Sequence, residues 1–257
     1  MELDRAFDSP EAKRRYNARL FTTIADRYDF ITRLLSYGRD QAWKRDLMVQ
    51  AAIAPGQQVL DLATGTGDLA LAAAAQGAEV VGLDLAPRMI RLARAKPGAD
   101  AVRFLVGDMT SLPLPPASVD VVTTGYGLRN VPDLDCAIAE IARVLRPGGR
   151  FLSLDFEKPA HAGWRRAYFA YLSVVGATVG TLLHGDPDTY RYIPASLARY
   201  PGAGAVADRL RAAGFASAAF STQVRRVRAR ESSARGGSRT RLALARTGPL
   251  QRLLRVG

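Results

Sequence analysis

The feature that most constrains the fold of this chain is a glycine-containing loop between an apolar run and an alanine-rich run. Residues 61–68 read Asp-Leu-Ala-Thr-Gly-Thr-Gly-Asp. Residues 58–62 are typical of a buried strand, and residues 68–76 are rich in alanine and leucine and stop at a glycine, as a helix does. Gly65 and Gly67 allow a tight turn and a close approach of a ligand to the backbone. A strand, a glycine turn and a helix in this order begin a βαβ unit and indicate an α/β protein.

The same alternation continues along the chain. Strands are predicted at residues 79–84, 102–106, 119–124 and 151–156, and helices at residues 87–96 and 134–145, with a turn at Pro147-Gly148-Gly149. Continuous apolar strands that alternate with helices indicate a sheet that is buried on both faces. We therefore predict a Rossmann-like, doubly wound, mostly parallel sheet with helices on both faces. Ligands of such sheets bind outside the carboxyl ends of the strands.

Three further segments surround this core. Residues 1–50 are predicted to form an N-terminal helical cap, with one helix over residues 14–32. Residues 167–183 carry no charge, but their length is at the lower limit of a transmembrane helix (~17–25 residues) and two glycines dilute their hydropathy. This pattern favours a buried helix or a lid, over about residues 164–183, rather than a membrane span. The sheet and the lid together occupy residues 51–220, and residues 221–257 form a basic tail.

The charge of the chain is concentrated in that tail. The net charge is +12, but residues 221–257 hold ten arginines and a single acid, so the other 220 residues carry only +3. The nearly balanced body gives no indication of a basic groove for nucleic acid. Cys136 is the one cysteine, which excludes an intramolecular disulfide, and the acidic N-terminus lacks the apolar core of a secretory signal. We therefore expect an intracellular protein.

An acid ends each of the first three predicted strands, and these acids define a candidate cofactor site. Asp84 suits the two hydroxyls of a ribose, Asp108 and Met109 suit an adenine ring, and Asp61 suits an ammonium group. The glycine loop alone also fits a dinucleotide such as NAD. However, acids at both ends of the loop disfavour a pyrophosphate, whereas S-adenosylmethionine has no phosphate and carries a sulfonium and an ammonium. The residues therefore favour S-adenosylmethionine.

With these residues in place, the chain resembles the class I S-adenosylmethionine-dependent methyltransferases. More narrowly, it is similar to the ubiquinone/menaquinone-biosynthesis C-methyltransferases of the UbiE/MenG type. The most specific matching segments are Gly127-Leu128-Arg129-Asn130-Val131 and Tyr190-Arg191-Tyr192-Ile193-Pro194-Ala195-Ser196-Leu197. The glycine loop, the Pro-Gly-Gly turn and the segments Tyr28-Asp29, Leu35-Ser36-Tyr37-Gly38, Trp43-Lys44-Arg45 and Asp155-Phe156-Glu157-Lys158-Pro159 also match.

The resemblance implies cofactor contacts at Thr66, Asp84, Asp108, Met109 and Gly125. It also implies a reaction, the methylation of a ring carbon on a reduced polyprenyl benzoquinol or naphthoquinol.

The resemblance to the family stops near Phe220. Two interpretations of the following tail therefore stay open: a polybasic arm that binds an anionic membrane, or a frameshifted C-terminus in GC-rich DNA, with residues 240–245 as a substitute for a missing last strand. Both predict that residues 231–238 are disordered.

Three residues are candidates for catalysis. Arg129 can stabilise a phenolate and Asn130 can donate to the same oxygen, which makes the neighbouring ring carbon nucleophilic. The alternative for Arg129 is a purely structural salt bridge. His184 is a candidate proton acceptor, and Tyr28, Tyr190 and Tyr192 are equally suited to form a pocket wall.

The remaining expectations concern other functions and partners. A methyltransferase for another small molecule, such as a polyketide or a sterol, is the main alternative, and an RNA methyltransferase is suggested only by the tail. We expect no metal and no nucleic-acid partner, and a homodimer stays open. A polyprenyl substrate predicts a cytoplasmic protein bound peripherally to the inner face of the membrane, with the uncharged helix as a greasy lid.

Overall fold

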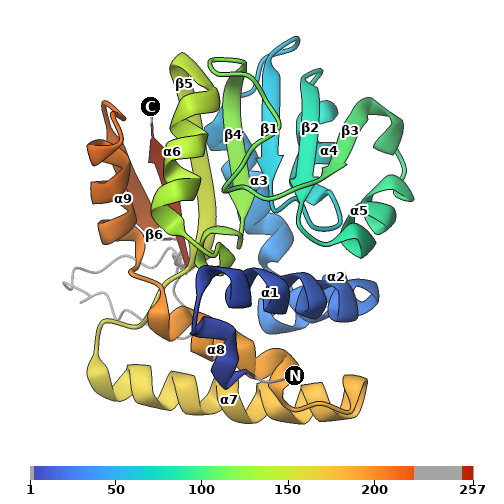
Figure 1. Cartoon of the computed structure of the whole chain (residues 1–257), viewed down its shortest axis with the longest axis vertical. Coiled ribbons are helices and arrows are strands. Elements are labelled where there is room, and N and C mark those ends of the chain that lie inside the picture. Colours follow the sequence, from blue (N-terminus) through green and yellow to red (C-terminus); the bar gives the residue numbers. More distant parts are fainter. Residues whose placement is uncertain (1–2, 223–250, 257) are drawn as a thin grey trace, which may run out of the picture.

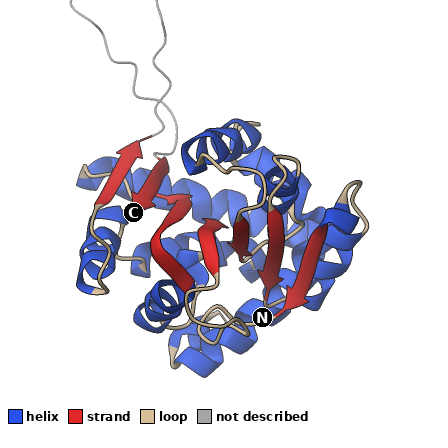
Figure 2. Cartoon of the chain, turned by 90° about the horizontal axis from the view of Figure 1, so that it is seen from above, coloured by secondary structure: helices blue, strands red, loops and turns tan. Residues whose placement is uncertain are grey.

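The computed structural model describes residues 3–222 and 251–256, and in this part of the chain seven strands form one sheet in the order β3-β2-β1-β4-β5-β7-β6 (Figures 1 and 2). The first five strands are parallel, whereas β7 is antiparallel to both β5 and β6. This confirms the predicted mostly parallel sheet. The strands are β1 (Gln58–Leu62), β2 (Glu79–Asp84), β3 (Val102–Val106), β4 (Val119–Gly125), β5 (Leu145–Phe156), β6 (Ala218–Thr222) and β7 (Gln251–Val256).

Helices cover both faces of the sheet, as predicted. Val59 of β1 packs with α3 (Asp40–Ala51), α4 (Asp68–Ala74) and α5 (Pro87–Arg94) on one face. Leu60 and Leu62 of the same strand pack with α6 (Leu134–Val144) and α9 (Ala203–Ala212) on the other. This alternation follows from the two-residue period of a strand. The sheet order reverses between β2-β1 and β1-β4, so the carboxyl ends of β1 and β4 flank the point where such sheets bind ligands.

A third group of elements closes the carboxyl end of the sheet (Figure 1). It contains the short 3₁₀-helix η1 (Asp4–Phe7), α1 (Pro10–Ile24), α2 (Tyr28–Leu35), α7 (Ala162–His184) and α8 (Asp188–Arg199). Their apolar side chains form a separate core with Met89 of α5, and Tyr16 and Phe7 stack on Tyr192. The N-terminal residues and the segment after β5, which are far apart in sequence, therefore build one cap.

The single helix predicted over residues 14–32 is wrong, because a 3₁₀ turn at Ala25–Arg27 separates α1 from α2. Two acids of this region bind the sheet domain. Asp26, within the turn, pairs with Arg88 of α5, and Asp29, just after it, accepts from Thr66 of the glycine loop and pairs with Lys96. These tertiary contacts outweigh the continuous helical periodicity of the sequence. The break brings Tyr28, the first residue of α2, close to the loop.

Two differences concern the last strands. β5 begins at Leu145, so the Pro147-Gly148-Gly149 turn lies as an irregularity within it, where its pairing with β4 shifts register. Residues 251–256, placed in a basic tail by the sequence, form β7, because the open edge of β5 offers backbone groups that a strand can pair. The proposed strand at residues 240–245 and the disorder expected for residues 231–238 lie outside the described residues.

Helix α7 lies along the outside of the cap and is not buried, contrary to one of its two predicted placements (Figure 1). Its length and composition would allow it to cross a membrane, but only 17% of its most apolar window is buried in the fold. Leu172, Gly176 and Gly180 form its buried face. The two glycines allow close packing: a Cβ atom at Gly176 would lie 3.0 Å from the backbone of Tyr190, and one at Gly180 would lie 2.5 Å from the carbonyl oxygen of Asp186.

We predict that Gly180→Ala lowers the free energy of unfolding by about 1–3 kcal/mol, because the added methyl group would overlap fixed backbone. Gly204→Ala in α9 is the matched control, since its Cβ meets nothing within 4 Å and alanine favours a helix. Urea denaturation of both variants measures the difference. Equal stabilities would show that α7 does not pack on the turn before α8 through this glycine.

Candidate functional site

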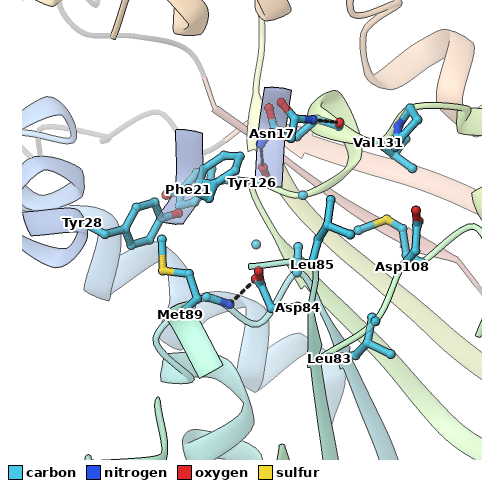
Figure 3. A pocket seen from close by; sticks show the side chains of 18 residues that line it. Asn17, Phe21, Tyr28, Leu83, Asp84, Leu85, Met89, Asp108, Tyr126 and Val131 are labelled. Atoms are coloured by element: carbon cyan, nitrogen blue, oxygen red, sulfur yellow. Dashed lines mark hydrogen bonds between the residues drawn. The ribbon is translucent and has the colours of Figure 1, made fainter. Parts of the chain in front are cut away.

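A pocket of about 610 Å³ opens where β1, β2, β3 and β4 end, below α1 and α2 (Figure 3). We call it the strand-end pocket. Figure 3 shows Phe21, Tyr28 and Tyr126 grouped on one side of it, across from Asp84. It is lined by Asn17, Phe21, Tyr28, Ala63, Gly65, Leu83, Asp84, Leu85, Met89, Gly107, Asp108, Met109, Gly125, Tyr126, Gly127, Asn130, Val131 and Pro132.

Asp84 is the central polar group of this pocket. One carboxylate oxygen accepts from the backbone N–H of Gly65 and the other from that of Ala86, both at 2.8 Å. Burial raises the pKa of Asp84 to about 6, although these two amides lower it. Each carboxylate oxygen has a second acceptor position. Asp84 can therefore accept hydrogen bonds from two hydroxyl groups, as predicted for a ribose.

Asp108, Met109 and Gly125 also line the pocket, at the places the sequence predicted. Asp108 pairs with Arg14 of α1 at 2.6 Å and accepts from the hydroxyl and N–H of Thr110. Met109 is buried and provides an apolar surface. A carboxylate edge beside a thioether suits a flat ring that has a donor group at its rim, such as adenine.

Three predicted cofactor residues lie behind the pocket wall. Asp61 accepts from the hydroxyls of Thr64 and Thr123, both at 2.7 Å, and burial raises its pKa to about 6. The Thr66 hydroxyl donates to Asp29, and a Cβ atom at Gly67 would meet Phe104 at 3.0 Å. None of these three lines the pocket. In the structure these three residues shape the loop beside the pocket, and their contact with a cofactor stays a prediction.

Charged side chains hold the glycine loop in place. Lys44 of α3 and Lys96, just beyond α5, each bind a different oxygen of Asp68 at 2.7 Å. Burial opposes ionisation of Asp68, but the two lysines hold its pKa well below the usual range. Lys96 also reaches Asp29 at 2.9 Å. The negative charge at the end of the loop is thus neutralised inside the protein, and the pocket keeps Asp84 and Asp108 as its carboxylates.

A second pocket, of about 760 Å³, lies between α1, α2, α7 and α8, and we call it the aromatic pocket. Its Phe21, Tyr28 and Tyr126 also line the strand-end pocket, so the two cavities meet at these rings. Tyr126 has a left-handed backbone (φ 62°) and stacks on Phe156. The aromatic pocket is lined by Leu20, Phe21, Ile24, Tyr28, Ile31, Thr32, Leu35, Tyr126, Arg129, Phe156, Tyr168, Leu172, Thr189, Tyr190, Tyr192, Ile193 and Leu197.

Arg129 is the charged residue that lines the aromatic pocket. It is 8% exposed, its Nε donates to Asp155 at 3.2 Å, and its Nη1 donates to Ser196 at 3.1 Å. Burial raises the pKa of Asp155, and Arg129 opposes that rise. Arg129 therefore forms the structural salt bridge of the alternative interpretation, with Asp155. However, its Nη2 atom has no hydrogen-bond acceptor among the described residues. Arg129 can accordingly be both held by the protein and available to a ligand.

Asn130 is separated from Arg129 by the pocket boundary. Asn130 lines the strand-end pocket and Arg129 the aromatic pocket, although both belong to the 3₁₀-helix η4 (Leu128–Asn130). The side-chain amide of Asn130 donates to the carbonyl of Tyr126 at 2.9 Å. The prediction that both residues contact one acceptor oxygen does not fit this arrangement.

Residues of α1 hold the same turn. The Lys13 ammonium donates to the carbonyls of Arg129 (3.2 Å) and Val131 (2.6 Å), and Asn17 donates to the carbonyl of Asn130. Burial and the nearby Arg129 lower the pKa of Lys13 to about 8. The N-terminal cap is thus anchored on the segment that carries the candidate catalytic arginine.

His184 lines neither pocket. Its Nε2 is 3.1 Å from the hydroxyl of Tyr190, which does line the aromatic pocket, and burial lowers its pKa. A direct role of His184 as base therefore has no support in the geometry. Tyr28, Tyr190 and Tyr192 are pocket-wall residues, as the alternative interpretation held.

The sequence analysis missed Asn17, Met89 and Gly127 as lining residues. The sequence did hold one signal for Asn17. Lys13, Asn17 and Phe21 are spaced four residues apart, so the two polar side chains lie on the same helix face as the apolar Phe21. In the part of the chain that the structure describes, no group of three histidine, cysteine, aspartate or glutamate side chains could hold a metal ion.

Comparisons with known proteins agree with this geometry. The model of the ubiE/COQ5 methyltransferase family matches residues 9–232. The chain is 43% identical over 200 residues to a demethylmenaquinone methyltransferase of Thermus thermophilus, covering 76% of this chain and 91% of that one. It is 40% identical over 200 residues to the ubiquinone/menaquinone biosynthesis C-methyltransferase UbiE of Rubrivivax gelatinosus, covering 77% and 78%. The solved structure of a SAM dependent methyltransferase from Aquifex aeolicus superposes with a TM-score of 0.55 at 16% identity, covering 89% of this chain and 96% of that one, which shows a shared fold.

We predict that Asp84→Ala weakens binding of S-adenosylmethionine by about 1.5–3 kcal/mol, because a charge-assisted acceptor is lost. Since the pKa of Asp84 is about 6, the wild-type carboxylate protonates and affinity falls as the pH drops through 6. Titration calorimetry at several pH values checks both effects. Asp208→Ala, at an exposed acid of α9, is the control.

The same raised pKa has an opposite consequence for the protein without ligand. The folded state binds more protons at Asp84 than the unfolded chain between pH 3.8 and about 6, so this group lowers the free energy of unfolding as the pH rises through that range.

The binding prediction has its own test. An affinity for S-adenosylmethionine that is unchanged in Asp84→Ala would contradict the assignment of Asp84 to the cofactor site.

Proposed function

We propose, because this chain belongs to the ubiE/COQ5 methyltransferase family, that it methylates a ring carbon of a reduced polyprenyl quinol with S-adenosylmethionine. The observation that carries this function is the contact between the two pockets at Phe21, Tyr28 and Tyr126. One pocket presents carboxylates and glycines at the strand ends, and the other presents aromatic rings and one arginine. A polar cofactor and an aromatic acceptor can therefore meet at a shared wall.

The strand-end pocket fits S-adenosylmethionine. When bound, this cofactor supplies an electrophilic methyl group on a positively charged sulfur. Asp84 would accept from the ribose hydroxyls, and Asp108 and Met109 would hold the adenine. Gly65 and Gly127 line this pocket, and Gly127 has no room for a side chain because a Cβ atom there would overlap the hydroxyl oxygen of Thr124. The carboxylate of Asp84, which is held by two backbone amides rather than by a cation, suits a positively charged ligand and disfavours a phosphate.

The aromatic pocket fits the quinol head group. Its rings offer stacking surfaces, and Arg129 is the cation among them. A phenolic hydroxyl has a pKa near ~10, so the site must favour the anion if the adjacent carbon is to act as a nucleophile. Arg129 does this by placing a fixed positive charge, held by Asp155 and Ser196, beside the acceptor oxygen.

The ring carbon must lose its proton after the methyl group is added. We assign this proton to a route through the Tyr190 hydroxyl to His184, 3.1 Å away. The lowered pKa keeps His184 neutral at pH 7, which leaves it able to accept a proton.

The surface around the aromatic pocket fits a membrane. One face of α7 carries four exposed apolar side chains, those of Trp164, Tyr171, Val174 and Leu182. The Tyr171 hydroxyl is 3.2 Å from that of Tyr37, which lies in the turn after α2. Helix α7 contains no acidic residue, and Arg165 and Arg166 stand near its start. An exposed apolar face with basic residues favours an anionic lipid surface. We define this apolar rim as Phe30, Leu34, Tyr37, Trp164, Tyr171, Val174 and Leu182.

We predict that Arg129→Gln in an Asp155→Asn background abolishes methyl transfer to the quinol but keeps affinity for S-adenosylmethionine. The second substitution avoids leaving a buried carboxylate without its partner, which would itself cost about 3–5 kcal/mol. Single-turnover assays and calorimetry separate the two effects, and Asp155→Asn alone is the control. The oxidised quinone should not react with the wild type, because its ring carbon is electrophilic. Equal turnover of both redox forms would refute the mechanism.

We predict that Trp164→Glu combined with Leu182→Glu reduces flotation with anionic vesicles by roughly tenfold, because two apolar anchors are lost and two negative charges are added. Val49→Glu is the control, since Val49 is equally exposed but lies on α3, outside the apolar rim. Flotation of all variants to the same extent as the wild type would exclude the rim as the lipid-binding surface.

A further inference from the structure

A third, smaller cavity adjoins the aromatic pocket between α2, α7 and α8, and we call it the side channel. It shares most of its wall with the aromatic pocket. The residues that line both are Ile31, Leu35, Leu172, Tyr190 and Ile193. The side channel therefore continues the acceptor site rather than forming a separate one.

The other wall residues are Leu34, Val175, Gly176 and Val179. No charged side chain is among the described residues that line the channel, and its one polar side-chain atom, the Tyr190 hydroxyl, already contacts His184. An apolar cavity without polar partners takes an apolar ligand.

The channel ends at the surface. Leu34 lines it and is 50% exposed, and Val174, next to the lining residue Val175, is 66% exposed. Both belong to the apolar rim. Gly176 packs closely against the backbone of Tyr190 at one wall of the channel, where an added Cβ atom would lie only 3.0 Å away. The channel thus connects the head-group pocket to the surface that faces lipid.

We infer that the side channel binds the polyprenyl chain of the quinol where it leaves the ring and leads the rest of the chain out between α2 and α7. This inference rests on the proposed function. It accounts for an apolar cavity that the methyl transfer itself does not need. It also means that the head group can be methylated while the far end of the chain stays in the bilayer.

The experiment compares a naphthohydroquinone without a side chain with one that carries a geranyl chain, both in detergent. We expect the wild type to prefer the geranyl substrate in kcat/KM by tenfold or more. Val175→Trp fills the channel and should lower this preference at least tenfold. Val49→Trp, the same change at an exposed position of α3, should leave the preference as it is.

The outcomes separate this inference from the proposed function. If the wild type methylates neither substrate, the proposed function fails. If it methylates both and Val175→Trp keeps the preference, or loses both activities equally while still binding S-adenosylmethionine, the channel does not bind the chain.

If Val175→Trp does not fold, as failure to bind S-adenosylmethionine would show, Leu34→Asp repeats the test. Leu34 is half exposed and so tolerates substitution, and the carboxylate would stand at the mouth of the channel. Leu34→Asp should also lower the preference, with Val49→Asp as its control. A preference that survives this substitution overturns the inference.

Discussion

The buried contact between Arg129 and Asp155 joins the three parts of the molecule. Asp155 belongs to β5, and it accepts from both the Nε and the backbone N–H of Arg129. The guanidinium also reaches Ser196 of α8, and the carbonyl of Arg129 accepts from Lys13 of α1. Sheet, C-terminal cap helices and N-terminal cap helix therefore meet at one residue. Because that residue also lines the aromatic pocket, the position of the acceptor site depends on all three.

Much of the fold was predictable because strands and helices of an α/β sheet leave strong local patterns. The bounds of β1, β2 and β3 match the predicted ranges residue for residue. The break between α1 and α2 was not predictable, because it follows from contacts of Asp26 and Asp29 with residues more than thirty positions away. Neither was β7, whose pairing depends on the open edge of β5.

The site shows the same limit. The sequence placed an acid at or near the end of each of three strands, but it could not say which of these acids face a ligand. Asp61 is turned to two threonine hydroxyls, whereas Asp84 is held by backbone amides and keeps acceptor positions towards the pocket. The aromatic pocket combines residues from four helices at both ends of the chain. This pocket could not be predicted from the sequence, because only the folded cap brings these residues together. Even so, the family's most specific motifs lie along the wall of the pocket.

The place of β7 has a consequence for how this protein is made. In space β7 lies between β5 and β6, yet both of those strands precede it in the sequence. During synthesis, β5 and β6 therefore leave the ribosome with edges that cannot yet be joined. An unpaired strand edge can template association with other chains. The nascent enzyme is thus most exposed to aggregation in the interval before β7 emerges, which is when a chaperone that shields strand edges would help most.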